Sequence, residues 1–427
     1  MSETQTSRRD FIAASATAAS AFAFAGGVHA QSGDAIKVGL IGCGGRGTGA
    51  AVNILEASAL AKIPIKIQTL GDVFDHRING SLAEMKKKDA GSVTATPDSC
   101  FVGFDAYKKV LATDIDLVLL ATPPGFRPMH LEAAVEAGKN IFAEKPVAVD
   151  VTGIRKVLAL VEKVKAKKLA VVAGTQRRHQ AGYQTLIKQV HDGAIGEITS
   201  ARAYWNGGDI WFNPRKEGMS DVQYQLHNWY HFLWLCGDHI VEQHVHNLDV
   251  MNWALQGHPI KATGMGGRSN RRVGDPKAVG HIFDHFAVEY EYPNGLILQS
   301  YCRQIDGTPG NVSEALVGTK GKTHSQPGLY ILNGKETGGG GEIDPYVQEH
   351  IDLLKSIKAG NAINELENVA TSTMTAILGR MATYTGKVLG WDQVMKTSKQ
   401  DTFPKDLAMD MELPVGPIPV VGKTPVV

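Results

Sequence analysis

The sequence has few of the features that mark several common protein classes. Its 427 residues include only four cysteines, which are scattered and form no C-x-x-C pair, so a disulfide scaffold and a cysteine-rich zinc site are both excluded. The charges almost cancel, with 44 Lys and Arg against 43 Asp and Glu. A net charge of +1 excludes a protein that binds nucleic acid through a general excess of positive charge.

What is present is ordinary globular composition with one surplus. Apolar residues make up 43% and charged residues 20%, values that exclude a disordered chain and a membrane bundle. The length predicts two or three domains, each able to bury a core. Glycine is the surplus, at 47 residues or about 11%, against about 7% in average proteins. The positions of these glycines therefore need an explanation.

The first thirty residues resemble a targeting signal. Ser7-Arg8-Arg9-Asp10-Phe11 precedes a weakly apolar stretch at residues 13–28, and Val28-His29-Ala30 offers a small-residue cleavage site. This pattern predicts a twin-arginine (Tat) signal peptide over residues 1–30 and export of a folded protein to the periplasm. The alternative is an N-terminal anchor helix, for which the stretch is short and rich in alanine and serine. No stable membrane span is expected after the signal is removed.

A strand, a glycine turn and a helix follow the signal. The strand-like run Ile36–Ile41 leads into Gly42-Cys43-Gly44-Gly45-Arg46-Gly47, and residues 50–60 suit a helix. This is G-x-G-x-x-G in the context that dinucleotide binding requires. The first glycine permits a tight turn, the second lets a pyrophosphate approach the backbone, and the third allows close helix–strand packing. We therefore predict that the turn, Gly45 and Arg46 included, contacts the phosphates of a dinucleotide.

Asp72 is predicted to select the dinucleotide. It follows a second strand-like run at residues 65–70, where an acidic side chain meets the adenosine ribose. Its carboxylate would accept a hydrogen bond from the 2′-hydroxyl of NAD and repel the 2′-phosphate of NADP. NADP remains the alternative, because Arg46 or Arg77 could pair with that phosphate. NAD is the favoured cofactor.

The alternation of strands and helices continues to about residue 150. Buried runs at residues 116–122 and Asn140–Ala143 flank a helix-compatible segment at residues 130–137. The pattern predicts a doubly wound α/β domain over residues 34–150. Ligands of such sheets bind beyond the carboxyl ends of the strands, which is where Thr122, Pro123, Glu144 and Lys145 fall.

Several motifs together resemble one enzyme family. The glycine turn, Ala121-Thr122-Pro123, Ala137-Gly138-Lys139-Asn140, Glu144-Lys145-Pro146 and later segments up to Tyr384-Thr385-Gly386-Lys387 are similar, in order and spacing, to the glucose–fructose oxidoreductase/inositol dehydrogenase (Gfo/Idh/MocA) family. The resemblance implies a second α+β domain, here residues 151–400, with an open and mainly antiparallel sheet. It also implies a sugar or cyclitol substrate and a homo-oligomer, a dimer or tetramer. Residues 401–427 are rich in proline and are predicted to form an extended arm.

The predicted chemistry lies between a lysine and one helix. The resemblance implies that Lys145 hydrogen-bonds both the reacting hydroxyl and the nicotinamide ribose, and that its following proline is cis. Thr122, Pro123 and Glu144 are likewise expected to contact the cofactor. The family has an Asp and, four residues later, a His; Glu242 and His246 take those positions, with Glu replacing Asp. We assign His246 as general base and Glu242 as its partner or relay. Asp249 lies further along the same helical face and is expected to orient these groups at the substrate. Structural roles for Lys145, Glu242 and His246 are the alternatives.

A metal site is the other interpretation of this segment. His239, Glu242 and His246 are spaced to share a helical face, and His244 lies between them. However, neither H-E-x-x-H nor H-x-x-E-H is present, so no metal is predicted. The roles of His239 and His244 stay open.

The substrate is expected to contact an arginine and an aromatic segment. Arg178 matches a family position near the substrate, and Trp205, Asn228 and Tyr230 belong to a region in which aromatic rings alternate with polar groups. Such a mixture suits a carbohydrate, whose C–H face stacks on rings while its hydroxyls hydrogen-bond. The alternative is an aromatic core beneath a long loop.

Taken together, the patterns predict a periplasmic NAD(P)-dependent oxidoreductase that acts on a hydroxyl of a sugar, sugar derivative or cyclitol. Because free nicotinamide nucleotides are scarce outside the cytoplasm, a tightly held cofactor recycled within each catalytic cycle is expected. Two alternatives remain: a redox-assisted glycosidase that works by oxidation and elimination, and a sugar-binding protein without catalytic activity.

Overall fold

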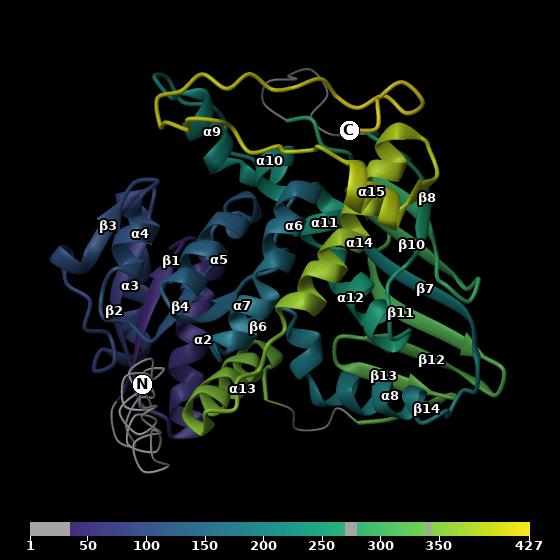
Figure 1. Cartoon of the computed structure of the whole chain (residues 1–427), viewed down its shortest axis with the longest axis horizontal. Coiled ribbons are helices and arrows are strands. Elements are labelled where there is room, and N and C mark those ends of the chain that lie inside the picture. The colour runs from purple at the N-terminus through teal and green to yellow at the C-terminus, as the bar shows by residue number, and fades with distance from the viewer. Residues whose placement is uncertain (1–34, 270–279, 339–342) are drawn as a thin grey trace, which may run out of the picture.

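The computed structural model describes residues 35–269, 280–338 and 343–427. The predicted signal peptide at residues 1–30 therefore lies outside the described residues. Figure 1 shows two halves side by side, each built on one sheet, with the C-terminal segment running across one end of both. This arrangement is the predicted combination of a Rossmann domain with a second domain built on a mainly antiparallel sheet.

The first half is a six-stranded sheet in which all strands are parallel, in the order β3-β2-β1-β4-β5-β6. This order is that of dinucleotide-binding sheets. Its central strands are continuous apolar runs because helices cover both faces. The strands are β1 (Ile36–Ile41), β2 (Ile65–Asp72), β3 (Cys100–Val102), β4 (Leu117–Leu120), β5 (Asn140–Ala143) and β6 (Val171–Ala173).

The sheet of the first half continues past the predicted boundary at residue 150, because β6 pairs with β5. A helix from the far end of the chain also belongs here: Val347, Ile351 and Leu354 of α13 (Pro345–Ala359) pack in the same core as α2 (Gly45–Ala61). A helix that follows the second sheet in the chain, α13, thus completes the core of the first domain. Its other helices are α3 (Asp75–Asp89), α4 (Ala106–Leu111), α5 (Arg127–Glu136), α6 (Val151–Ala159) and α7 (Val161–Ala166).

The second half is a nine-stranded sheet that is antiparallel except where β10 pairs with β7. Burial alternates along β10, so one face of the sheet is packed and the other is open. The strands are β7 (Ile198–Gly207), β8 (Lys261–Gly267), β9 (His285–Glu291), β10 (Ile297–Gln304), β11 (Asn311–Gly318), β12 (Gly321–Gln326), β13 (Leu329–Leu332), β14 (Lys335–Glu336) and β15 (Leu389–Gly390).

Helices cover the packed face of the second sheet. The long helix α14 (Leu366–Thr385) is buried along almost its whole length, between the two halves of the molecule. The remaining helices are α8 (Ala181–His191), α9 (Asp221–His227), α10 (Leu233–Cys236), α11 (His239–Glu242), α12 (Val245–Ala254) and α15 (Trp391–Thr397). Four short 3-10 helices are also described: η1 (Pro97–Ser99), η2 (Pro124–Phe126), η3 (Gln176–His179) and η4 (Trp229–His231).

The segment predicted to be one continuous helix is two. Helix α11 ends at Glu242 and α12 begins at Val245. The His246 amide donates to the carbonyl of Gln243, three residues back, rather than to that of Glu242, four residues back. The Glu242 carbonyl instead accepts a hydrogen bond from Lys145 Nζ, so the regular helical hydrogen bonding is interrupted here. The expectation that Glu242, His246 and Asp249 line one helical face is corrected accordingly.

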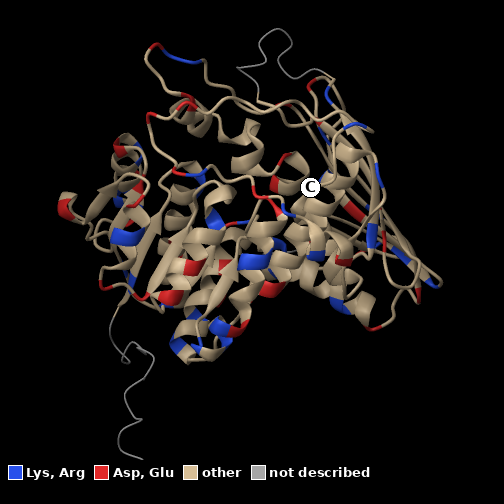
Figure 2. Ribbon diagram, turned by 45° about the horizontal axis from the view of Figure 1, so that its top comes forward, with Lys and Arg blue, Asp and Glu red and all other residues tan. Residues whose placement is uncertain are grey.

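The C-terminal segment, residues 401–427, contains no helix or strand and lies over α9. Side chains of α9 hold its backbone: Gln225 Nε2 donates to the Leu413 carbonyl, and the Leu413 amide donates to Asp221 Oδ2. Lys and Arg residues are interspersed with Asp and Glu residues along the ribbon (Figure 2), in keeping with the balanced composition. None of the helices in the described residues has the length and apolar character needed to span a bilayer.

Candidate active site

A cleft of about 630 Å³ lies at the carboxyl ends of the first sheet and is walled on its other side by the second half. Gly42, Asp72, Thr122 and Lys145 line it, each at or just beyond the end of a different parallel strand, β1, β2, β4 or β5. Parallel strands end at the same edge of a sheet, so the topology itself gathers these side chains.

The glycine turn is shaped for a ligand's phosphates. Gly42 has a φ of +95°, which a residue with a side chain rarely adopts. A Cβ on Gly45 would meet nothing within 4 Å, so the first turn of α2 is open towards the cleft. The first turn of α2 carries no acidic residue. The N-cap residue, Gly44, has no side chain that could accept a hydrogen bond from the amides of this turn. The free N–H groups and helix dipole fit a pyrophosphate.

Gly47→Ala is expected to break this turn. A Cβ at residue 47 would lie 1.7 Å from the Gly42 carbonyl oxygen, a backbone atom that cannot move without distorting the turn. We expect destabilisation by about 1–3 kcal/mol and loss of NAD binding, measured by thermal unfolding and by titration with NAD. Gly45→Ala is the matched control and should leave the melting temperature unchanged. Equal stability of both variants would contradict the steric argument.

Asp72 and Arg77 lie at the end of the cleft where an adenosine ribose would bind. Asp72 Oδ2 accepts from the Cys43 amide at 2.7 Å and Oδ1 accepts from the Phe74 amide at 2.9 Å. These bonds fix the carboxylate against the glycine turn, while burial raises its pKa. Arg77 also lines the cleft. A fixed acceptor beside the turn fits the diol of NAD.

Lys145 and Glu242 form a buried ion pair between the two halves. Lys145 Nζ lies 3.0 Å from Glu242 Oε1 and also donates to the Glu242 carbonyl at 2.5 Å. The peptide bond between Lys145 and Pro146 is cis. Among the described residues, Glu242 Oε2 is buried without a hydrogen-bond partner. The pair therefore fixes the ammonium group and leaves one carboxylate oxygen unused in the cleft.

His246 lies beside this pair and lines the same cleft. Burial lowers the pKa of its imidazole well below 6.5, and the positive charges of Lys145 and Arg177 lower it further. Its ring stacks on Trp205 with centroids 5.6 Å apart and an interplanar angle of 19°. The guanidinium of Arg177 lies over the Trp205 ring as well, at 5.8 Å. His246 is thus held as a neutral imidazole, the form that can accept a proton.

The cleft gathers most of the predicted site residues, although the sequence placed them far apart. Those that line it are Gly42, Gly44, Gly45, Arg46, Asp72, Thr122, Pro123, Glu144, Lys145, Tyr230, Glu242 and His246. Those outside the lining are Gly47, Arg178, Trp205, Asn228 and Asp249. Gly47 packs beneath the turn, and Trp205 supports His246 from behind.

Comparison with known proteins places this geometry in a family. Residues 36–172 match the model of the Gfo/Idh/MocA oxidoreductase family, NAD-binding Rossmann fold, and residues 183–324 match the model of its C-terminal domain. The chain belongs to the Gfo/Idh/MocA family. The first of these models describes an oxidoreductase family with an NAD-binding Rossmann fold.

Relatives of this Gfo/Idh/MocA protein include dehydrogenases of cyclitols and sugars. An inositol 2-dehydrogenase of Rhizobium meliloti is 37% identical over 177 residues, which cover 42% of this chain and 46% of that enzyme. The match thus spans about half the length of the curated relative. A scyllo-inositol dehydrogenase of Lactobacillus casei, solved with NAD(H) and scyllo-inositol, has a TM-score of 0.64 at 20% identity and covers 84% of this chain and 100% of that one. A levoglucosan dehydrogenase solved with NADH and levoglucosan gives 0.65 at 17% identity, with coverage of 84% and 100%.

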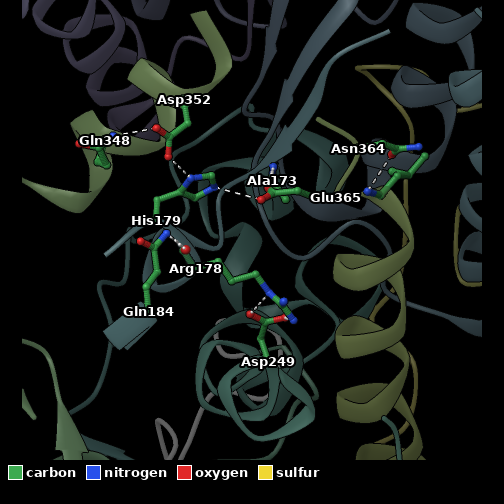
Figure 3. Close-up of polar contacts among 10 residues, drawn as sticks. Ala173, Arg178, His179, Gln184, Asp249, Gln348, Asp352, Asn364 and Glu365 are labelled. Carbon is green, nitrogen blue, oxygen red and sulfur yellow. Dashed lines mark hydrogen bonds and ion pairs between the residues drawn. The ribbon is translucent and has the colours of Figure 1, made fainter. Parts of the chain in front are cut away.

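Three polar residues predicted to contact the substrate of this Gfo/Idh/MocA protein have partners within the protein. Arg178 and Asp249 form a two-bond ion pair, with Nε–Oδ2 and Nη2–Oδ1 distances of 2.8 and 2.9 Å (Figure 3). Asn228 is fully buried and bonds the backbone at Asn213. Arg178 and Asp249 therefore satisfy each other outside the cleft lining, whereas Asn228 fixes the backbone of Asn213, which lines the cleft.

The extra histidines have partners of their own. His239 Nδ1 lies 3.3 Å from the Tyr230 hydroxyl, and His244 Nε2 lies 2.7 Å from the Ser300 hydroxyl. Burial lowers the pKa of His244 to about 3. In the described residues no three His, Cys, Asp or Glu side chains are grouped so as to hold a metal ion.

Tyr346 and Trp211 are among the lining residues that the sequence analysis did not name as site residues. Tyr346 comes from α13, about 200 residues after the Rossmann strands, and its ring lies 5.0 Å beneath the guanidinium of Arg46. Gln176 Nε2 donates to its hydroxyl at 3.1 Å. Trp211 lines the opposite wall. The aromatic segment drew attention to Trp211, whereas nothing in the local sequence signals Tyr346.

His179 joins the two halves near this site. Its Nδ1 lies 2.7 Å from Asp352 Oδ2 and its Nε2 lies 3.1 Å from Glu365 Oε1 (Figure 3). Burial alone would lower its pKa, but the bonds to Asp352 and Glu365 raise it from 6.5 to about 10. The imidazolium therefore ties α13 and the start of α14 to η3.

The His179 pair is expected to make stability depend on pH. A raised folded pKa means that the contribution is full below pH 6.5 and is lost as pH rises through about 10. His179→Gln should therefore lower the melting temperature at pH 7, and the difference from the unmodified protein should shrink towards pH 10. His285→Gln, which removes a more exposed His–Asp contact, is the control and should have a small effect. A difference that does not vary with pH would contradict the assignment.

Proposed function

We propose that this protein is an NAD-dependent dehydrogenase that acts on a hydroxyl group of a sugar, a sugar derivative or a cyclitol. One observation carries the proposal: Lys145, Glu242 and His246 converge in the cleft that also contains the glycine turn and Asp72. The substrates after which the similar proteins are named, inositols and levoglucosan, support a polyhydroxylated ring. NADP is the less favoured cofactor because the Asp72 carboxylate would repel its 2′-phosphate.

Oxidation of an alcohol requires that a hydride leave the carbon and that a proton leave the hydroxyl, and the residues of the cleft fit both requirements. Bound NAD would supply the hydride acceptor. Lys145 Nζ, fixed by Glu242, is placed to donate a hydrogen bond to the reacting oxygen and stabilise negative charge on it. An imidazole nitrogen of His246, neutral in its buried position, takes the hydroxyl proton. Glu242 keeps the ammonium in place, and its unused oxygen can accept a hydrogen bond from the substrate.

The proposal extends to a cofactor that stays bound through the catalytic cycle. It is supported by the twin-arginine pattern in residues 1–30, which predicts export of a folded protein to the periplasm, where free nicotinamide nucleotides are scarce. A retained cofactor would be reduced and reoxidised in each turnover. Oxidation of one sugar coupled to reduction of another satisfies this condition, as does oxidation of a glycoside followed by elimination and re-reduction.

The test is to denature the purified protein and identify the nucleotide that it releases by mass and absorbance. We expect NAD or NADH in near-equimolar amount. Adding sugars and cyclitols to the native protein should then change the absorbance band of reduced nicotinamide. A protein that neither releases nor binds a nicotinamide nucleotide would disprove the proposed function. One that binds it without any redox change would be a passive sugar-binding protein.

A further inference from the structure

One wall of the cleft carries an aromatic ring that is neither buried nor used by the proposed chemistry. Trp211 lines the cleft, yet 46% of its surface is exposed. The catalytic groups differ sharply: Lys145, Glu242 and His246 are between 6% and 9% exposed. The cleft therefore has a closed end, where the reaction takes place, and an open end at Trp211. A large apolar ring left in water at an open end indicates a surface that a ligand covers.

The backbone beneath this ring is fixed at two points. The Trp211 carbonyl accepts a hydrogen bond from His231 Nε2 at 2.9 Å. Two residues later, Asn213 exchanges two hydrogen bonds with the buried side chain of Asn228, at 2.8 and 3.0 Å. These bonds hold the segment although it has no helix or strand. The ring is consequently presented by a fixed support, as a binding platform requires.

Two neighbouring rings orient the platform. Tyr230 meets Trp211 edge-on, with centroids 5.6 Å apart and an interplanar angle of 74°, and Trp229 lies 5.7 Å away at 56°. Tyr230 is almost fully buried, and its hydroxyl accepts from Gln304 at 3.1 Å. Both neighbours line the cleft. They support one side of the indole while its exposed surface stays available.

The ligand that suits this surface is a ring at some distance from the reacting hydroxyl. An indole face with nearby polar groups matches the C–H face of a pyranose or an aryl group. Asn213 and His227 line the cleft on the same side and can hydrogen-bond hydroxyls at the ring's edge. If the ring to be oxidised lies between Lys145 and His246, the less exposed part of the lining, the exposed indole is left for a second ring.

We propose that Trp211 forms a second subsite, and that the substrate is a glycoside whose second ring, a sugar or an aryl aglycone, stacks on the indole. The inference rests on the proposed function, since it assumes that the ring to be oxidised lies at Lys145 and His246. The second subsite goes beyond the proposed function because it names the substrate class: two linked rings rather than a free monosaccharide or cyclitol.

The experiment compares binding of paired probes to protein saturated with NAD. Methyl and phenyl glycosides of glucose, galactose and mannose differ only in the second ring, and their dissociation constants can be measured by calorimetry without any redox step. In the unmodified protein, we expect the phenyl glycoside of the preferred sugar to bind about tenfold more tightly. Trp211→Ala should reduce this preference to within about twofold, and Trp211→Phe, which keeps a flat ring, should retain most of it.

Two controls separate a second subsite at Trp211 from a general effect of removing an apolar side chain and from an effect on NAD binding. Met265→Ala removes another exposed apolar side chain, on β8 and outside the cleft lining, and should not alter the preference. NAD affinity is measured for every variant. Weaker NAD binding by Trp211→Ala would show that the indole stacks on the cofactor, and would overturn the second subsite. Equal binding of methyl and phenyl glycosides by the unmodified protein, or no binding of either, would overturn it too; release and reduction of NAD would still test the proposed function independently.

Discussion

Lys145→Met is expected to lower kcat by about a thousandfold, because it removes the ammonium group that pairs with Glu242 in the cleft and that we propose donates to the reacting oxygen. NAD should still bind, since the glycine turn and Asp72 do not contact the Lys145 ammonium. Steady-state kinetics and NAD titration of the same preparation provide the measurement. A variant that keeps more than a tenth of the activity would remove Lys145 from the chemistry.

Loss of stability has to be separated from loss of chemistry in this variant. Removing Lys145 leaves the buried Glu242 carboxylate unpaired, at a cost of about 3–5 kcal/mol. The double variant Lys145→Met/Glu242→Gln carries no such charge and should recover most of the melting temperature. Its activity should stay as low as that of the single variant. Recovery of activity together with stability would show that the lysine acts only through the fold.

His246→Asn is expected to lower kcat by about a hundredfold to ten-thousandfold, since the amide cannot take the hydroxyl proton. Asn is close in size to the imidazole's inner half, so Trp205 keeps a partner and the fold should persist. Kinetics at saturating NAD check the result. His191→Asn, on the exposed surface of α8, is the matched control and should leave kcat unchanged.

The pH profile tests the same assignment without a mutation. Burial and two nearby cations lower the pKa of His246 well below 6.5, so the neutral form persists as the solution becomes more acidic. In the pH profile of kcat/KM, the midpoint of the acid limb should therefore lie well below pH 6.5. An acid limb at or above pH 6.5 would assign the base to a group other than His246.

The elements of the first half could be predicted closely from the sequence because their signals are local. The runs Ile36–Ile41 and Asn140–Ala143 are strands with the predicted bounds, and the glycine turn joins β1 to α2 as expected. Parallel strands buried on both faces are continuous apolar runs, and this signal needs no knowledge of distant contacts. The convergence of Asp72 and Lys145 then follows from the topology.

Predictions that depended on distant partners were less complete. Arg178 pairs with Asp249, 71 residues away, and no local pattern distinguishes an arginine that binds a substrate from one that binds a carboxylate. The break between α11 and α12 was missed because the side-chain spacing is compatible with one helix, whereas the Glu242 carbonyl is taken by Lys145 from the other half. Tyr346 was missed because it reaches the cleft only through the packing of α13 against the first half, which no local pattern indicates.

The return of α13 to the first half has a consequence for how the chain is made. Val347, Ile351 and Leu354 fill a core whose strands, β1 to β6, all end by residue 173, and Tyr346 on the same helix completes the cleft. The nucleotide site therefore cannot be finished while the ribosome is still making the second sheet; it closes only near the end of synthesis. A truncated chain that stops before residue 345 would expose an apolar flank of α2, and early release would yield a protein that aggregates rather than a free-standing Rossmann domain.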